Sequence, residues 1–204
     1  MTGKPAPLST IEDVRRNMSR SQATRVARTR QAIFEAVASI DDEAAVTVGE
    51  VVRRAGISRA AFYTHFSGLD ELAIAIMRDM VQTVSALHHE ARGTTYASWR
   101  EASVAMLRRT VDHMVQNRRL YLSVLEMPGS SGAFDAAVVE LAGSIVAAFE
   151  RMADVLDQKD VEDMARFIAS GTLTMIIHWM RTNPSMPVDE MVARLISFFP
   201  NVER

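Results

Sequence analysis

Apolar residues recur along this chain at spacings of three and four, and strict alternation of apolar and polar residues is rare. That period places apolar side chains on one face of an α-helix, whereas alternation would indicate β-strands. The pattern therefore predicts an all-α protein. We expect helices over about residues 25–40, 48–54, 59–65, 69–90, 99–116, 120–126, 133–156, 161–182 and 188–199.

Several of these helices follow residues whose side chains cap a helix. TVGE at residues 47–50 and SWRE at residues 98–101 are capping boxes, in which a hydroxyl and a carboxylate satisfy free backbone N–H groups. Ser58 and Asp160 are further N-cap candidates. Gly56 supplies the left-handed backbone that a tight exit from the preceding short helix requires.

Two short helices joined by a glycine-containing turn form a helix-turn-helix, here over residues 47–65. In the second helix, Phe62 shares one face with Phe66, four residues on, and we expect both rings to point inward. Polar side chains then project outward, beside small residues that let a backbone approach another surface. These outward and small residues are Arg59, Ala60, Ala61, Tyr63, Thr64 and His65.

This set of side chains carries the chemistry that recognises duplex DNA. An arginine pairs with O6 and N7 of guanine, and Tyr, Thr and His side chains donate hydrogen bonds to phosphates. The second helix is therefore suited to the major groove. The alternative is an ordinary short connecting helix, because helix-turn-helix shapes also occur in proteins that never meet DNA.

Charge is distributed unevenly along the chain. Residues 1–66 hold 10 Lys+Arg and 7 Asp+Glu, a net charge of +3, whereas residues 67–204 hold 13 and 18, a net charge of −5. Six arginines and no acid fall within residues 14–34. A basic N-terminal part on an acidic body indicates a polyanionic partner for one end only. A solvated arginine-rich tail is the alternative interpretation.

Composition narrows the class of protein. The chain has 204 residues, is 48% hydrophobic and lacks cysteine, so we expect a globular protein without disulfides or thiolate metal sites. No segment has the pattern of a signal peptide or a membrane span, and we expect a cytoplasmic protein that does not engage a membrane. Catalytic and nucleotide-binding motifs are also missing, so we expect no enzymatic activity, cofactor or metal.

The stretch TVGEVVRRAGISRAAFYTHFSGLDEL, residues 47–72, resembles the N-terminal domain of TetR-family transcriptional regulators. Upstream, the pattern Arg-x-x-Ile-Phe-x-Ala-Val of residues 30–37 resembles the first helix of that family. Gly171, Trp179 and Pro184 fall as they do in its C-terminal region. The motif-level match covers residues 30–72, and the rest resembles the family only in length and helix order.

The resemblance implies an all-α homodimer with an N-terminal three-helix DNA-binding domain and a larger helical domain. We expect a flexible arginine-containing arm over residues 1–22, the DNA-binding domain over residues 23–68, and an effector-binding and dimerisation domain over residues 69–204. Dimerisation would use the last two long helices. By the same resemblance, the residues expected to contact double-stranded DNA are Arg25, Arg28, Thr47, Ser58, Arg59, Ala60, Tyr63, Thr64 and His65.

Two positions depart from the family pattern. Leu69 stands where the family often has a lysine that pairs with a phosphate, and Ala61 stands where it often has a threonine. Both differences weaken the part of DNA affinity that does not depend on sequence. The arginines of residues 15–30 could replace it, for instance by reaching a neighbouring minor groove.

The C-terminal part is rich in large apolar side chains. Residues 164–180 are nearly all apolar, which predicts a helix buried on two sides, one against the body and one against a second subunit. Nine of the 13 methionines follow residue 100; they suit either an irregular ligand pocket or plain filling of a core. Candidate pocket residues are Trp99, Met106, Thr110, Met114, Tyr121, Phe149, Met175 and His178.

These observations predict a repressor that binds a palindromic operator as a homodimer and is released by a small apolar or aromatic effector. Two further interpretations remain. One is a helical dimerisation or adaptor protein that keeps the helix-turn-helix shape without binding DNA. The other is a DNA-binding protein without an effector.

Overall fold

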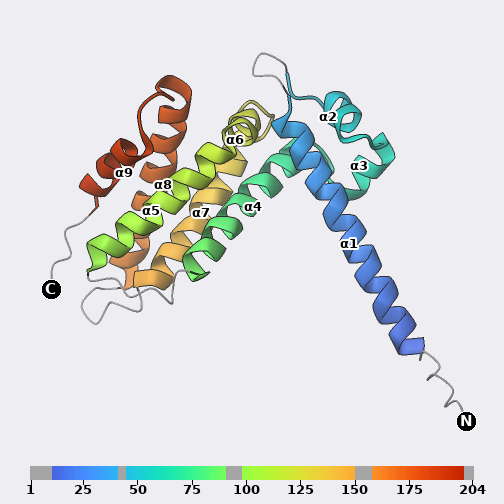
Figure 1. Ribbon diagram of the computed structural model, residues 1–204, viewed down its shortest axis with the longest axis horizontal. Coiled ribbons are helices and arrows are strands. Elements are labelled where there is room, and N and C mark those ends of the chain that lie inside the picture. Colours follow the sequence, from blue (N-terminus) through green and yellow to red (C-terminus); the bar gives the residue numbers. More distant parts are fainter. Residues whose placement is uncertain (1–10, 41–44, 91–97, 150–157, 200–204) are drawn as a thin grey trace, which may run out of the picture.

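The computed structural model describes residues 11–40, 45–90, 98–149 and 158–199. Within these ranges the chain forms nine helices and no strand, which confirms the all-α prediction (Figure 1). The helices are α1 (Ile11–Ala38), α2 (Val48–Ala55), α3 (Arg59–His65), α4 (Leu69–Glu90), α5 (Trp99–Gln116), α6 (Arg118–Leu125), α7 (Ser130–Phe149), α8 (Gln158–Thr182) and α9 (Val188–Ser197).

The helices form two groups, which we call the head (α1–α3) and the body (α4–α9). Figure 1 shows the head at one end of the molecule, with α4 running from it into the body. In the body, α7 packs between α4 and α8, and α5 packs against α9. The head also contacts the body through α1 and α6. The apolar core is continuous between the two groups, from Phe66 through Leu72 to Val124.

The first helix is longer than the sequence pattern indicated. We expected residues 1–22 to form a loose arm and the helix to begin near Arg25, but α1 begins at Ile11. No glycine or proline interrupts residues 11–38, so nothing in the local sequence ends the helix before Ala38. The N-terminal half of α1 extends away from the other helices (Figure 1).

The helix caps agree with the sequence in most places. The Thr47 hydroxyl accepts a hydrogen bond from the Glu50 backbone N–H at 3.2 Å, and the Ser98 hydroxyl accepts one from that of Glu101 at 3.1 Å. Asp160 is not a cap: α8 begins at Gln158, which places the Asp160 carboxylate in the first turn, where the helix dipole favours negative charge. The seventh helix begins at Ser130, three residues earlier than expected.

A tight contact joins the α6–α7 turn to the start of α4. Gly129 has a φ of 76°, a conformation that favours glycine. A Cβ on Gly129 would lie 2.7 Å from the Cβ of Asp70 and 3.2 Å from its Cα. Only a residue without a side chain therefore fits between the turn and the first residues of α4.

Candidate nucleic-acid interface

The turn between α2 and α3 has the local features that the sequence predicted. Gly56 ends α2 with a φ of 65°, in the left-handed region. The Ser58 hydroxyl accepts a hydrogen bond from the backbone N–H of Ala61 at 3.1 Å and so caps α3. The two helices are therefore held at a fixed angle by their own backbone chemistry.

The inner face of α3 is anchored by aromatic side chains. Phe62 is 0% exposed and Phe66 2% exposed, as expected. The Phe66 ring stacks against the Phe34 ring of α1, with the ring centroids 6.4 Å apart. A helix of only seven residues is marginally stable by itself, so α3 depends on this aromatic packing and on the Ser58 cap.

The outer face of α3 carries four of the nine predicted DNA-contacting residues. Tyr63 is 55% exposed, and Arg59, Ala60 and Thr64 are also exposed, whereas His65 is half-buried. The Thr64 hydroxyl donates to the Ala60 carbonyl oxygen at 2.9 Å, so it must turn away from its own helix before it can donate to a phosphate. Thr47 differs, because its hydroxyl oxygen accepts the capping bond and leaves the proton available to a phosphate.

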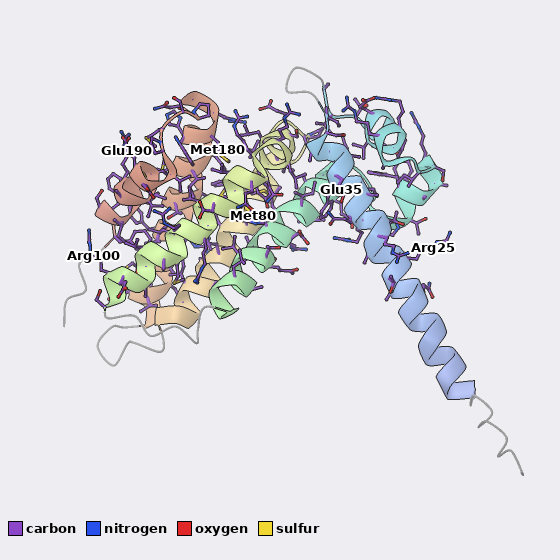
Figure 2. All side chains as sticks on the ribbon, viewed as in Figure 1. Arg25, Glu35, Met80, Arg100, Met180 and Glu190 are labelled. Atoms are coloured by element: carbon purple, nitrogen blue, oxygen red, sulfur yellow. The ribbon has the colours of Figure 1, made fainter. Side chains whose placement is uncertain are left out.

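The arginines of α1 differ in their exposure and in what they contact. Arg30 is half-buried and its guanidinium lies 5.0 Å from the Phe66 ring centroid and 5.8 Å from that of Phe34, in cation–π geometry. Arg25 and Arg28 are exposed, and Figure 2 shows Arg25 on the part of α1 that extends past α3. Arg30 therefore stabilises the head, whereas Arg25 and Arg28 remain available to an anionic partner.

An acid–base cluster fixes the first turns of α2. The Glu50 carboxylate accepts hydrogen bonds from Arg53 and Arg54, which lower its pKa to about 2. Arg54 also donates to the backbone carbonyl of Ser39 and thereby links α2 to the end of α1. The expected capping box is thus only half formed, because the Glu50 carboxylate engages the two arginines.

Gly49 is a neighbour of Arg59 that the sequence pattern does not predict. A Cβ on Gly49 would lie 3.3 Å from Nη2 of Arg59, so the guanidinium rests against the first turn of α2. A glycine near the start of a helix is a weak signal by itself, and no sequence rule connects it to a residue ten positions later. The contact makes Gly49 part of the surface that positions Arg59.

The two departures from the family pattern have structural roles. Leu69 is partly buried and packs against the core where α4 begins. Ala61 is half-buried, and its backbone N–H donates to the Ser58 cap. Neither side chain offers a hydrogen-bond donor at these positions, and the reduced phosphate contact expected from the sequence stays a prediction.

The predicted pocket residues of the body are only partly brought together. Met114, Thr110 and Tyr121 are buried at 0%, 5% and 4% exposure, and Met106 and Met175 are partly buried. His178 is exposed on the outer face of α8 and does not join this group. The side chains of Trp99 and Phe149 lie outside the described part of the structure.

A polar pair lies among these apolar residues. The phenol oxygen of Tyr121 and Nε2 of His113 are 2.6 Å apart. Burial lowers the pKa of His113, and burial together with the charge of Asp79 raises the pKa of Tyr121. The pair is therefore neutral near pH 7 and links α5 to α6 through a single hydrogen bond.

The outer face of α8 is not fully polar. Phe167 is 73% exposed, and Gly171, Thr174 and His178 follow it along the same side of the helix. We expected this helix to be buried on two sides. Within one chain, α8 is buried on one side only. Among the described helices, none is long and apolar enough to cross a membrane.

Comparisons with known proteins match both parts of the chain. The family model for bacterial regulatory proteins of the tetR family matches residues 43–76, and the model for a transcriptional regulator C-terminal region matches residues 101–201. No curated protein sequence matches the chain significantly.

Several solved structures share the fold at low sequence identity. The fatty acid degradation regulator FadR from Bacillus halodurans superposes with a TM-score of 0.61 at 11% identity, over 87% of this chain and 99% of its own. FadR from Bacillus subtilis, solved in complex with stearoyl-CoA, gives 0.58 at 11% identity over 84% and 95%. A TetR transcriptional regulator from Streptococcus agalactiae gives 0.56 at 18% identity over 88% and 97%.

Proposed function

The chain belongs to the TetR family of transcriptional regulators, and from this premise we propose that it is a repressor that binds a palindromic operator as a homodimer. Members of this family are DNA-binding regulators rather than enzymes. The proposal places the protein in the cytoplasm with its DNA. It divides the chain into an N-terminal arm up to residue 22, a DNA-binding domain over residues 23–68 and an effector-binding body over residues 69–204.

One observation gives the main support for sequence-specific DNA binding. The capped and aromatically anchored α3 presents Arg59, Ala60 and Tyr63 to solvent. We assign base contacts to Arg59 and Ala60, with Tyr63 and His65 contacting phosphates or base edges and Thr64 beside them. Thr47 and Ser58 stand at the starts of α2 and α3, where free N–H groups favour phosphate.

The positive charge that this proposal needs comes from α1. Arg25 and Arg28 are exposed, and Arg15, Arg16 and Arg20 precede them on the same helix. We propose that this basic segment follows the phosphate backbone beside the half-site and replaces the phosphate contacts missing at Leu69 and Ala61. Each phosphate neutralised releases counterions, so this contribution depends on salt concentration.

Dimerisation is proposed to use α7 and α8, the last two long helices. These helices pack against each other and expose apolar side chains, with Val139 at 53% and Phe167 at 73% exposure. Burying such a surface against its symmetry mate would produce the two-fold dimer that a palindromic operator requires. The two reading helices would then have to lie about 34–36 Å apart, or a multiple of this.

The effector is proposed to enter the body among α4, α5, α6 and α8. The apolar and polarisable side chains Met114 and Met175 of the core, with the half-buried Met106, favour a ligand with an apolar or aromatic part. The complex of the Bacillus subtilis FadR with stearoyl-CoA supports a small-molecule effector for a body of this fold. Binding would favour a conformation in which the two reading helices are wrongly spaced for the operator.

Selection of bound sequences from a random duplex pool, at about 150 mM salt, tests the proposal. We expect a two-fold symmetric consensus, because a symmetric dimer reads the same bases twice. Size-exclusion chromatography with light scattering on the same preparation checks that the protein is a folded dimer. A folded dimer that enriches no sequence would contradict the proposal and favour a dimerisation or adaptor protein.

A further inference from the structure

One arginine of the body has a buried nitrogen without a hydrogen-bond partner. Among the described residues, Nη1 of Arg109 in α5 is buried from solvent and has no acceptor within reach. A guanidinium is always charged, and a buried charged donor without an acceptor is strongly unfavourable. Such a group calls for an acceptor that is absent from the free chain.

The neighbouring arginines show that this is unusual in the body. Arg108, the preceding residue, is exposed and forms an ion pair with Asp189 of α9. Arg118, which is half-buried like Arg109, donates Nε to the Met180 carbonyl oxygen at 3.0 Å. The partner found in each of these cases is missing for Nη1 of Arg109.

The position of Arg109 places it on the wall assigned to the effector. It follows Met106 by three residues and precedes His113 by four, so the three side chains share one face of α5. His113 contacts Tyr121 of α6, and the charge of Asp79 on α4 acts on both. This face of α5 is therefore directed towards α4 and α6, and its three side chains are half-buried.

The acid nearest this wall is Asp79, whose charge acts on His113 and Tyr121, and it forms no hydrogen bond with Nη1 of Arg109. Met106 is apolar, and the Thr110 hydroxyl donates to the Met106 carbonyl oxygen at 3.1 Å. His113 is neutral near pH 7 because burial lowers its pKa. Nη1 of Arg109 is thus a buried donor that none of these neighbouring groups satisfies.

We propose that Arg109 binds the anionic group of the effector, and that the effector is an amphipathic anion. It has an apolar part that lies among the methionines and a carboxylate or phosphate that accepts from the guanidinium. The inference rests on the proposed effector site. It narrows the apolar or aromatic effector expected from the sequence to one that also carries a negative charge.

The test compares matched anionic and neutral ligands in the absence of DNA. The probes are dodecanoate, dodecyl phosphate and dodecanol, with 2-naphthoate and 2-naphthol as an aromatic pair. Binding to the full-length protein is measured by isothermal titration calorimetry. We expect at least one anion to bind about 10-fold or more tightly than its neutral counterpart, because only the anion accepts a charge-assisted hydrogen bond from Arg109. Dodecanoate and dodecyl phosphate separate a carboxylate from a phosphate as the preferred group.

Two variants assign the preference to Arg109. Arg109→Met is expected to bind the anion and its neutral counterpart equally, whereas Arg109→Lys keeps part of the preference. The matched control is Arg108→Met, which removes the adjacent exposed charge and should leave the preference unchanged. Without ligand, Arg109→Met should melt at or above the wild-type temperature, because it removes a charged group whose buried Nη1 lacks a partner.

Several outcomes would overturn the inference. These are equal binding of neutral and anionic probes to the wild type, binding of none of the anions, and an unchanged preference in Arg109→Met. A melting temperature of Arg109→Met well below that of Arg108→Met would show that Arg109 has a structural partner instead. Because no DNA is present, failure here leaves the operator-binding proposal standing, and failure of sequence selection leaves this ligand test valid.

Discussion

Arg59 lies where α2 and α3 meet, and its exposed guanidinium is the best candidate for reading a base. Replacing it with alanine should reduce operator affinity by about 1–3 kcal/mol and relax the preference at one base pair in each half-site. Binding to a panel of single-base operator variants measures both effects. Equal loss on every sequence would mean that Arg59 contacts only phosphate.

Gly49 provides a second test of how Arg59 is positioned. Alanine at this position raises helix propensity by about 0.5–1 kcal/mol, so the free protein should become more stable. Its Cβ would lie 3.3 Å from Nη2 of Arg59, so the guanidinium must shift by a few tenths of an ångström. We expect Gly49→Ala to weaken the base preference assigned to Arg59 while it raises the melting temperature.

The control for this effect is Gly132→Ala in α7, where an added Cβ meets nothing within 4 Å. It should change stability without changing base preference. In an Arg59→Ala background, Gly49→Ala should no longer affect binding. A Gly49→Ala protein that keeps the full preference would show that the position of Arg59 in the free chain is irrelevant to recognition.

His113 makes the stability of the body depend on pH. Its pKa in the folded protein is lowered from the ordinary 6.5, so the unfolded chain binds the proton more readily. The stabilisation is therefore complete above about pH 6.5 and decreases as pH falls through that value. Urea denaturation at about pH 8 and about pH 5.5 should show that wild type loses more stability on acidification than His113→Gln. An equal loss in the two proteins would exclude His113 as the cause.

Local chemistry explains which residues could be predicted from the sequence. Thr47, Gly56 and Ser58 act on backbone groups within three or four positions, so their roles follow from spacing alone. Arg30 packs on Phe66, which is far from it in sequence, and its separation from the exposed arginines of α1 requires the tertiary structure. The orphaned nitrogen of Arg109 likewise depends on what surrounds it rather than on its neighbours in the chain.

At the scale of whole elements, the continuous α1 changes how its arginines can act. A loose arm would present them as a diffuse charge, whereas a helix fixes their directions. Ala23 is exposed, so proline there breaks the helix upstream without disturbing the core or the net charge. We expect Ala23→Pro to weaken operator binding and flatten its salt dependence nearly as much as deletion of residues 1–22 does.

The control for this prediction is Ala23→Ser, which should bind like the wild type. Affinity measured across a salt series, together with helix content from circular dichroism, separates the two effects. If Ala23→Pro loses helix but keeps the wild-type salt slope, the arginines act as a diffuse charge and their helical arrangement has no role.

Helix positions were predictable, but several ends were not. The spans of α3, α4 and α5 follow their caps and apolar periods closely. The start of α1 is hard to predict because its first residues are rich in arginine and serine, which resembles a loose segment, although residues 11–38 contain no glycine or proline. The start of α7 follows Gly129, whose close contact with Asp70 is invisible in the sequence.

At the scale of the whole molecule, the proposed dimer rests on exposed apolar side chains of α7 and α8. Phe167→Glu would place a charge in that interface and should convert the dimer to monomers, with loss of operator binding. Sedimentation velocity measures the change. Phe198→Glu, which alters a side chain 66% exposed after α9, is the matched control and should remain dimeric. A dimeric Phe167→Glu protein would mean that another surface joins the subunits.

The head is attached to the body at two places, through α1 on α6 and through residues 66–68, which connect α3 to the start of α4. If the head moves as a rigid body, it keeps both contacts only when it rotates about the line that joins them. The far end of α1 is about 42 Å from its C-terminal end, given the rise of a 28-residue helix. A rotation of about 5° would therefore move that end by up to about 4 Å, enough to break a phosphate contact. Small rearrangements in the body would thus be amplified most strongly at the basic end of the longest helix.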